Sequence, residues 1–226
     1  MKGLFSLDSP LMQFLTRACD LMITNILFLF SCIPVFTIGA ALCGMTKVNQ
    51  AIVTGDERGI WNLYVTGFKD NFKHATITWL CLLLVAASLV CYWLLIDNFI
   101  RGFWATVLLI VMAILAIIAA SLAVYLFPLI VRYKNTLRDH VRNAGILAIT
   151  RLLLTPLLIV FAGVPFILPL ISLEAFLQTL IFWVIIGFAF LNYMANLCLK
   201  PIYNVLESPS MQPGYTEEED ESDEEE

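Results

Sequence analysis

Five long apolar runs occupy most of the 226-residue chain and restrict it to one class of fold. Hydrophobic residues make up 60% of the sequence and charged residues 14%, so a soluble domain of this size has too little polar surface to cover them. Each run is long enough for a helix to cross a hydrocarbon core about 30 Å thick. None alternates as a lipid-facing β-strand does. The sequence predicts an all-α, polytopic membrane protein with about five transmembrane helices, at 21–43, 76–96, 104–131, 146–171 and 176–198.

The third and fourth runs depart from the pattern of one straight helix of membrane-spanning length. The third would be about 40 Å long as a helix, so we expect it to tilt or to project into water. The fourth contains Pro156, Pro165 and Pro169. We therefore expect this span to end near residue 164, a turn at 165–175, and a return helix from residue 176.

Basic residues indicate the orientation of the chain. The segments 44–75 and 132–145 each hold four Lys or Arg residues, and Lys200 follows the last run. We expect the protein to lie in the plasma membrane. The positive-inside rule then places both basic loops and the C-terminus in the cytoplasm, and the N-terminus outside the cell. We expect 1–20 to be an amphipathic segment in the membrane interface, 21–205 to form the five-span domain, and the first run to be an uncleaved anchor.

The C-terminal segment 206–226 has a different composition. Ten of the 18 carboxylates lie in 207–226, which contains no Lys or Arg. Such a segment repels itself and buries little, so we expect a disordered acidic tail. A solvated tail is the simple interpretation, and the alternative is a contact with a basic patch on a partner.

A short repeat provides the strongest internal signal. FKDNFKHA at 68–75 aligns with LRDHVRNA at 137–144, and each copy leads into an apolar run. Each copy, taken as a helix, places its apolar residues on one stripe with basic residues beside it. The chain therefore predicts an internal two-span repeat, each copy carrying a cytoplasmic amphipathic helix.

Two interpretations of these helices remain open. They can lie along the lipid headgroups, or they can form a paired docking surface for a cytoplasmic partner. The residues that would form this surface are Phe68, Lys69, Phe72, Lys73, Leu137, Arg138, Val141 and Arg142.

The first run contains a proline motif, IPVFTIGA at 33–40. Pro34 has no N–H and cannot continue a regular helix without a kink, while Thr37 and Gly39 allow another helix to approach closely. A kinked, closely packed helix and a broken helix that lines a cavity are both compatible with this pattern. Asn192 and Asn196 in the fifth run could bond to the kink or tie helices together.

Chemical motifs give little sign of catalysis. The sequence has no P-loop, no Gly-x-Ser-x-Gly and no His-Glu-x-x-His, and its two histidines lie in the basic loops. We expect no enzyme activity, no catalytic residue, no cofactor, no metal site and no nucleic-acid partner.

Three further patterns can be considered together: IPVFTIGA at 33–40, FxxNFKxA at 68–75, and YLFPL at 125–129 followed by Arg132. Together they resemble the YesL-like family of bacterial membrane proteins. The resemblance covers most of residues 1–205, whereas the acidic tail departs from it. Members of that uncharacterised family tend to be encoded beside carbohydrate ABC importers. The resemblance implies an accessory membrane subunit in carbohydrate uptake, with importer permease or ATPase subunits as partners.

Two other functions are compatible with the same residues. A stand-alone permease or channel for a small solute would use the Pro34 region and the polar residues of the fifth run. A membrane signalling or scaffold protein would act through the loops or the tail. The sequence names neither a ligand nor an oligomeric state.

Overall fold

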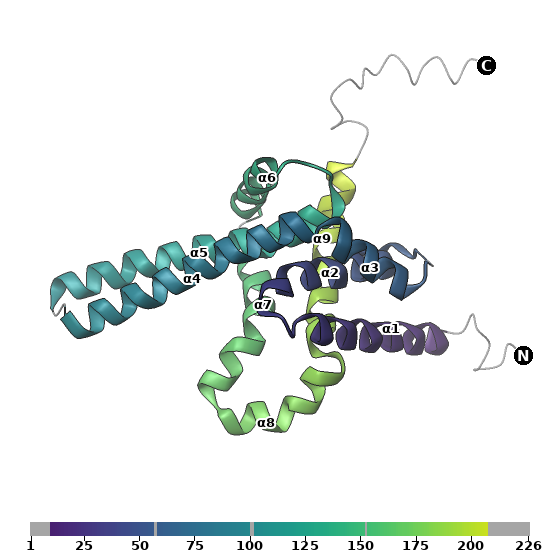
Figure 1. The fold of residues 1–226 in the computed structure, drawn as a ribbon, viewed down its shortest axis with the longest axis horizontal. Helices are drawn as coiled ribbons and strands as arrows, with labels where there is room; N and C mark the ends of the chain where they lie inside the picture. Colours follow the sequence, from purple (N-terminus) through teal and green to yellow (C-terminus); the bar gives the residue numbers. More distant parts are fainter. Residues whose placement is uncertain (1–9, 57, 100–101, 152, 208–226) are drawn as a thin grey trace, which may run out of the picture.

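The computed structural model describes residues 10–56, 58–99, 102–151 and 153–207, and within these ranges the regular structure is entirely helical (Figure 1). The elements in chain order are α1 (Pro10–Ser31), the 3₁₀-helix η1 (Val35–Thr37), α2 (Ile38–Thr54), α3 (Ile60–Asp70), α4 (Phe72–Phe99), α5 (Phe103–Arg132), α6 (Leu137–Thr150), α7 (Leu154–Ile171), α8 (Leu173–Phe182), the π-helix η2 (Trp183–Gly187) and α9 (Phe188–Leu206).

Four helical segments in the described part of the chain are long and apolar enough to cross a membrane. They are Leu11–Ser31, Phe72–Ile96, Phe103–Arg132 and Leu177–Val205. A fifth is obtained if the bent pair Leu137–Thr150 and Leu154–Pro165 counts as one span. The predicted all-helical, polytopic architecture is confirmed.

The first predicted span, 21–43, is not one helix. α1 ends at Ser31, and α2 begins at Ile38 and packs against α1 (Figure 1). Pro34 at the junction has extended backbone angles and cannot donate a helical hydrogen bond. The Thr37 hydroxyl donates to the carbonyl oxygens of Ser31 and Pro34, both at 2.6 Å, and so satisfies backbone groups that the break exposes.

The fourth predicted span also divides, at a different place from the one expected. α6 ends at Thr150, and α7 runs from Leu154 to Ile171 at an angle of 113° to it. Pro156 lies in the first turn of α7, where a missing N–H costs no helical bond. The turn expected at 165–175 is present but much shorter, because α7 continues through Pro165 and the break falls at Ser172, between α7 and α8.

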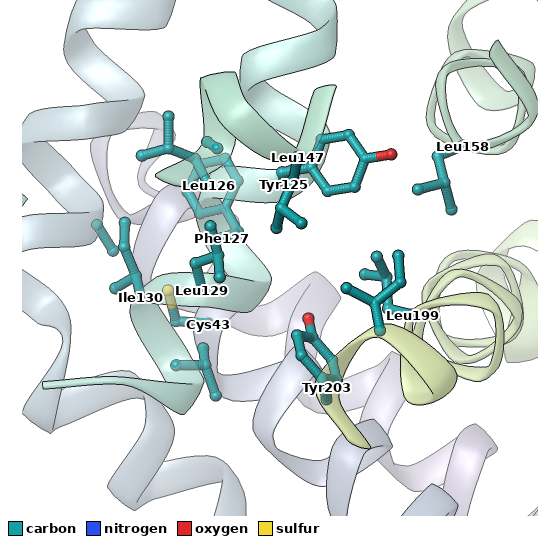
Figure 2. Close-up of a cluster of buried hydrophobic side chains, with 14 of the residues drawn as sticks. Cys43, Tyr125, Leu126, Phe127, Leu129, Ile130, Leu147, Leu158, Leu199 and Tyr203 are labelled. Carbon is teal, nitrogen blue, oxygen red and sulfur yellow. The ribbon is translucent and has the colours of Figure 1, made fainter. Parts of the chain in front are cut away.

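A buried core surrounds the C-terminal third of α5. Tyr125, Leu126, Leu129 and Ile130 lie here in contact with apolar residues from α2, α6, α7 and α9 (Figure 2). The α2 helix is itself buried along most of its length. The centre of the molecule therefore consists of α2, the end of α5 and the second half of α9.

Glycines allow the helices around α2 to approach closely. A Cβ atom on Gly39 would lie 2.4 Å from the Ala75 carbonyl oxygen of α4, and one on Gly67 of α3 would lie 2.6 Å from Cβ of Lys47. Both distances are shorter than real contacts, so only glycine fits without a shift of the backbone.

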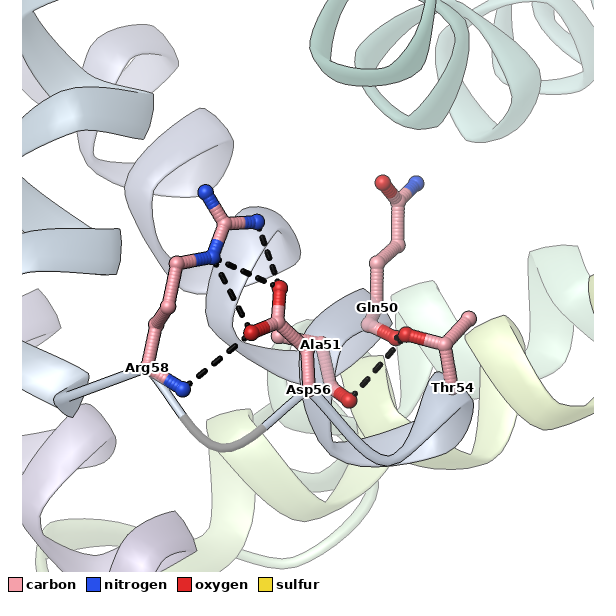
Figure 3. Close-up of polar contacts among 5 residues, drawn as sticks. All are labelled: Gln50, Ala51, Thr54, Asp56 and Arg58. Atoms are coloured by element: carbon pink, nitrogen blue, oxygen red, sulfur yellow. Dashed lines mark hydrogen bonds and ion pairs between the residues drawn. The ribbon is translucent and has the colours of Figure 1, made fainter.

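The C-terminus of α2 is fixed by a cap and an ion pair. Gly55 has a left-handed backbone (φ 78°) and donates its N–H to the Ala51 carbonyl oxygen. The Thr54 hydroxyl donates to the Gln50 carbonyl oxygen, and Arg58 forms an ion pair with Asp56 (Figure 3). This cap ends α2 beside the candidate site described below.

α4 and α5 form a long hairpin that projects from this centre (Figure 1). Only 6% of the most apolar stretch of each helix is buried. Apart from its base, the hairpin therefore presents apolar side chains to its surroundings.

Two predicted segments lie partly or wholly outside the described residues. The expected interfacial segment 1–20 is described only from Pro10, where α1 begins and continues past residue 20 without interruption. The acidic tail is described only as far as Glu207.

Candidate functional site

A line of buried amide side chains connects α1, α2 and α9. It begins at Asn25 on α1, whose side chain is fully buried. Its Nδ2 donates to the carbonyl oxygens of Trp183 (3.0 Å) and Val184 (2.7 Å), and its Oδ1 accepts from the backbone N–H of Ala189 (3.0 Å). A π-helix leaves backbone groups without regular partners, and Asn25 supplies these partners for η2.

The line continues between α2 and α9. Asn49 Nδ2 donates to the Ala189 carbonyl oxygen (3.1 Å) and to Asn192 Oδ1 (2.8 Å). Asn192 Nδ2 donates in turn to the Thr46 hydroxyl (3.1 Å), and Asn196 Nδ2 donates to Asn192 Oδ1 (3.0 Å). Inside a membrane protein such bonds tie helices together, because an amide without a partner is costly there.

The line ends at a small polar recess between α2, α5 and α9. It has a volume of about 10 Å³, which is room for one water molecule. Its lining residues are Gln50, Val53, Thr54, Arg132, Asn196, Lys200, Tyr203 and Asn204. Asn196 is 2% exposed, and its Oδ1 has no hydrogen-bond partner among the described residues.

Two cations stand at this recess. Arg132 ends α5, and its Nε and Nη2 donate to the two Glu207 carboxylate oxygens at 2.6 and 2.7 Å. The Tyr133 hydroxyl donates to the same carboxylate at 3.2 Å, and the guanidinium lies 4.5 Å from the centre of the Tyr203 ring. Lys200 Nζ donates to the Val53 carbonyl oxygen near the end of α2 (3.0 Å).

The positive charge of Arg132 lowers the pKa of the Glu207 carboxyl. The Arg132 guanidinium holds the pKa of this carboxyl below its ordinary value, chiefly through the paired hydrogen bonds. Glu207 is therefore a bound carboxylate in a fork of three donors, a geometry typical of oxyanion recognition.

The predicted docking residues lie at the base of the α4–α5 hairpin. The first copy of the repeat crosses the junction of α3 and α4, whereas the second lies inside α6. The copies therefore differ in structure, although Ala75 and Ala144, at equivalent positions, are both fully buried in one cluster. The basic side chains Lys69, Lys73, Arg138 and Arg142 are all exposed.

The apolar docking residues pack differently in the two copies of the repeat. The Phe68 and Phe72 rings contact each other, with centroids 5.6 Å apart. In α6, Leu137 is half-buried but Val141 is 43% exposed, and His140 is buried in its place. The buried face of α6 is thus displaced by one residue from the predicted stripe.

The residues of the proline motif separate in the structure. Pro34 and Thr37 form the break, while Gly39 lies one turn later against α4. Asn192 bonds to Asn49 and Thr46 of α2, and Asn196 bonds to Asn192, so neither is bonded to the break. The sequence did not predict the partners of Asn192 on α2 or the Arg132–Glu207 pair. Amide side chains within apolar runs are, however, a sequence signal for polar contacts between spans.

One comparison with known proteins gives a match. Residues 21–93 match the model of the family described as "Protein of unknown function, DUF624". The matched segment extends from α1 to α4 and includes the break at Pro34, all of α2, and half of the amide line. No curated protein matches the chain. No solved structure matches it either.

Proposed function

We propose that this protein is a YesL-like accessory membrane subunit of carbohydrate uptake, which contacts an ABC-type importer in the plasma membrane. In this proposal it catalyses no reaction. The two basic segments and the C-terminus face the cytoplasm, where importer ATPase subunits reside.

The projecting α4–α5 hairpin carries the proposal. No charged residue occurs in 74–96 or in 103–131, so the hairpin suits either lipid or the spans of another membrane protein. Large apolar side chains on both helices are more than half exposed, for example Leu84 at 72% and Ile117 at 60%. A hairpin held at one end leaves both helices free to pack against a partner.

Exposed basic residues at the base of the hairpin support a second contact on the same side. Lys69 and Lys73 flank the start of α4, and Arg138 and Arg142 lie in the first two turns of α6. A permease beside the hairpin would bring its cytoplasmic partner near these cations, which favour an acidic surface.

The test is a pull-down from native membranes in mild detergent, followed by mass spectrometry. We expect importer permease or ATPase subunits with the unchanged protein, and their loss when Lys69, Lys73, Arg138 and Arg142 are all replaced by Glu. Lys134→Glu is the control, because Lys134 is exposed nearby but lies outside both repeat copies. Recovery of a kinase or regulator without transport subunits would instead support a signalling scaffold.

A stand-alone permease is the second candidate, and the amide line favours it. Polar groups that extend from Asn25 to the recess at Arg132 resemble the lining of a polar path. Flux of a small solute into proteoliposomes that contain only this protein, reduced by Asn49→Leu, would support the permease and contradict the accessory role.

A further inference from the structure

The recess between α2, α5 and α9 has the chemistry of a binding site for a phosphate group. Arg132 and Lys200 both line it, and Glu207 is the carboxylate that pairs with Arg132. Asn204 adds an exposed amide beside the same space, whereas Gln50 Nε2 and the Thr54 hydroxyl already donate to the carbonyl oxygens of Pro128 and Gln50. Paired cations with neutral donors are the usual surroundings of a bound phosphate.

An unpartnered buried group lies in the same recess. Asn196 Oδ1 is buried without a hydrogen bond among the described residues, which is costly unless a ligand or water supplies a donor. A protonated phosphate or a hydroxyl carried by a phosphoryl group would supply one. The recess admits only about one water-sized group, so the oxyanion itself would lie at the mouth on Arg132.

Glu207 shows how an anion is held at that mouth. Its two oxygens receive Nε and Nη2 of Arg132 in a bidentate arrangement, with the Tyr133 hydroxyl as a third donor. The Tyr203 ring beneath the guanidinium fixes its plane. The side chain of Glu207 is 43% exposed and follows the last residue of α9, so an external anion can reach and replace it.

The position in the fold favours a phosphate over other anions. Arg132 is the last residue of the span formed by α5, and Lys200 lies near the end of the last span. Cations at the ends of spans lie at the depth of lipid headgroups. We propose that Arg132, Lys200 and Asn196 form a site for a phosphate-bearing group, and that Glu207 occupies the guanidinium when this group is absent.

The same chemistry is offered by a lipid headgroup and by a free phosphate, and two arms of the test distinguish them. In the first arm, protein in phosphatidylcholine nanodiscs is titrated with inorganic phosphate and with glycerol 3-phosphate by calorimetry. In the second, protein in mixed phosphatidylcholine and phosphatidylglycerol is analysed by native mass spectrometry for retained phosphatidylglycerol.

Substitution of the two partners of the ion pair should change the affinity for the phosphate-bearing group in opposite directions. Arg132→Gln removes the fork, and we expect binding about tenfold weaker or more, the loss typical of a charge-assisted hydrogen bond. Glu207→Gln removes the competitor, and we expect tighter binding. This variant changes an exposed carboxylate, so it keeps the test valid even if Arg132→Gln fails to fold.

Matched controls separate the site from general charge. Asp70→Asn removes an exposed carboxylate elsewhere, and Arg17→Gln removes an exposed cation on α1. Both should leave affinity unchanged. The proposal is overturned if Glu207→Gln shows no saturable binding in either arm, or if the controls alter affinity as much as the site variants do.

Discussion

Asn25 shows how a single buried amide determines the packing of two spans. It receives one backbone N–H and donates to two carbonyl oxygens of the irregular turn that contains η2. Without it, these backbone groups would lie in an apolar interior with no regular partner. The residue thus allows the last span to depart from α-helical geometry where it meets α1.

We expect Asn25→Ala to lower the free energy of unfolding by about 2 kcal/mol, because it leaves buried polar groups unpaired. The measurement is the thermal midpoint of the protein in detergent. Asn62→Ala, at an exposed position of α3, is the control and should change little. Equal midpoints for the two variants would show that Asn25 does not hold the π-helix.

The Arg132–Glu207 pair predicts a pH dependence at the end of α9. In the folded protein the pKa of the Glu207 carboxyl is lower than its ordinary value. The ion pair therefore stabilises the fold above the ordinary pKa, and this stabilisation is lost as the pH falls through the lowered, folded-state pKa. Carboxyl ¹³C NMR should show Glu207 titrating below the ordinary glutamate pKa, and Arg132→Gln should return it toward that value. An unshifted Glu207 in the unchanged protein would contradict the pair.

At the scale of elements, α2 and α4 approach each other closely where Gly39 meets Ala75. A Cβ added at Gly39 would also lie 2.7 Å from Cβ of Trp79. Because backbone atoms are involved, neither helix can yield by rotating a flexible side chain.

Gly39→Ala should therefore destabilise the protein by about 1–3 kcal/mol through overpacking. Gly145→Ala in α6 is the matched control, since its Cβ would meet only Cδ2 of Leu122, at 3.9 Å. There we expect a gain of about 0.5–1 kcal/mol, because glycine is a poor residue inside a helix. Thermal midpoints of the two variants that shift in the same direction would refute this account of the contact.

The elements also show how far the sequence determines the fold. Length and hydrophobicity predicted the spans at 76–96 and 104–131 closely, because each run is apolar throughout and forms one unbroken helix. The prediction of a single span at 21–43 was wrong. Hydrophobicity alone does not distinguish one continuous span from two helices, one of them buried, that are joined by a break at a proline. In α6 the repeat predicted an apolar stripe through Val141, but His140 is buried instead and Val141 is exposed.

The candidate site was harder to predict than the spans. Asn192 and Asn196 stood out in an apolar run, but Asn49, which bonds to Asn192, comes from a segment interpreted as a loop. The Arg132–Glu207 pair joins residues 75 positions apart, and no local pattern links them. Tertiary packing alone brings these groups together.

At the scale of the whole molecule, the structure divides into a packed centre and a projecting hairpin (Figure 1). The centre holds the amide line and the recess, while the hairpin offers its apolar faces outward. In the proposed accessory role, the hairpin would contact another membrane protein and the centre would keep its packing.

The most direct measurement is photo-crosslinking in native membranes, with a photoreactive amino acid in place of Leu84 on α4. The same amino acid in place of Phe14 on α1 is the control, because the two side chains are similarly exposed, at 72% and 69%. The accessory-subunit account predicts adducts with an importer permease subunit from position 84 and none from position 14. Adducts with lipid alone at position 84 would contradict it.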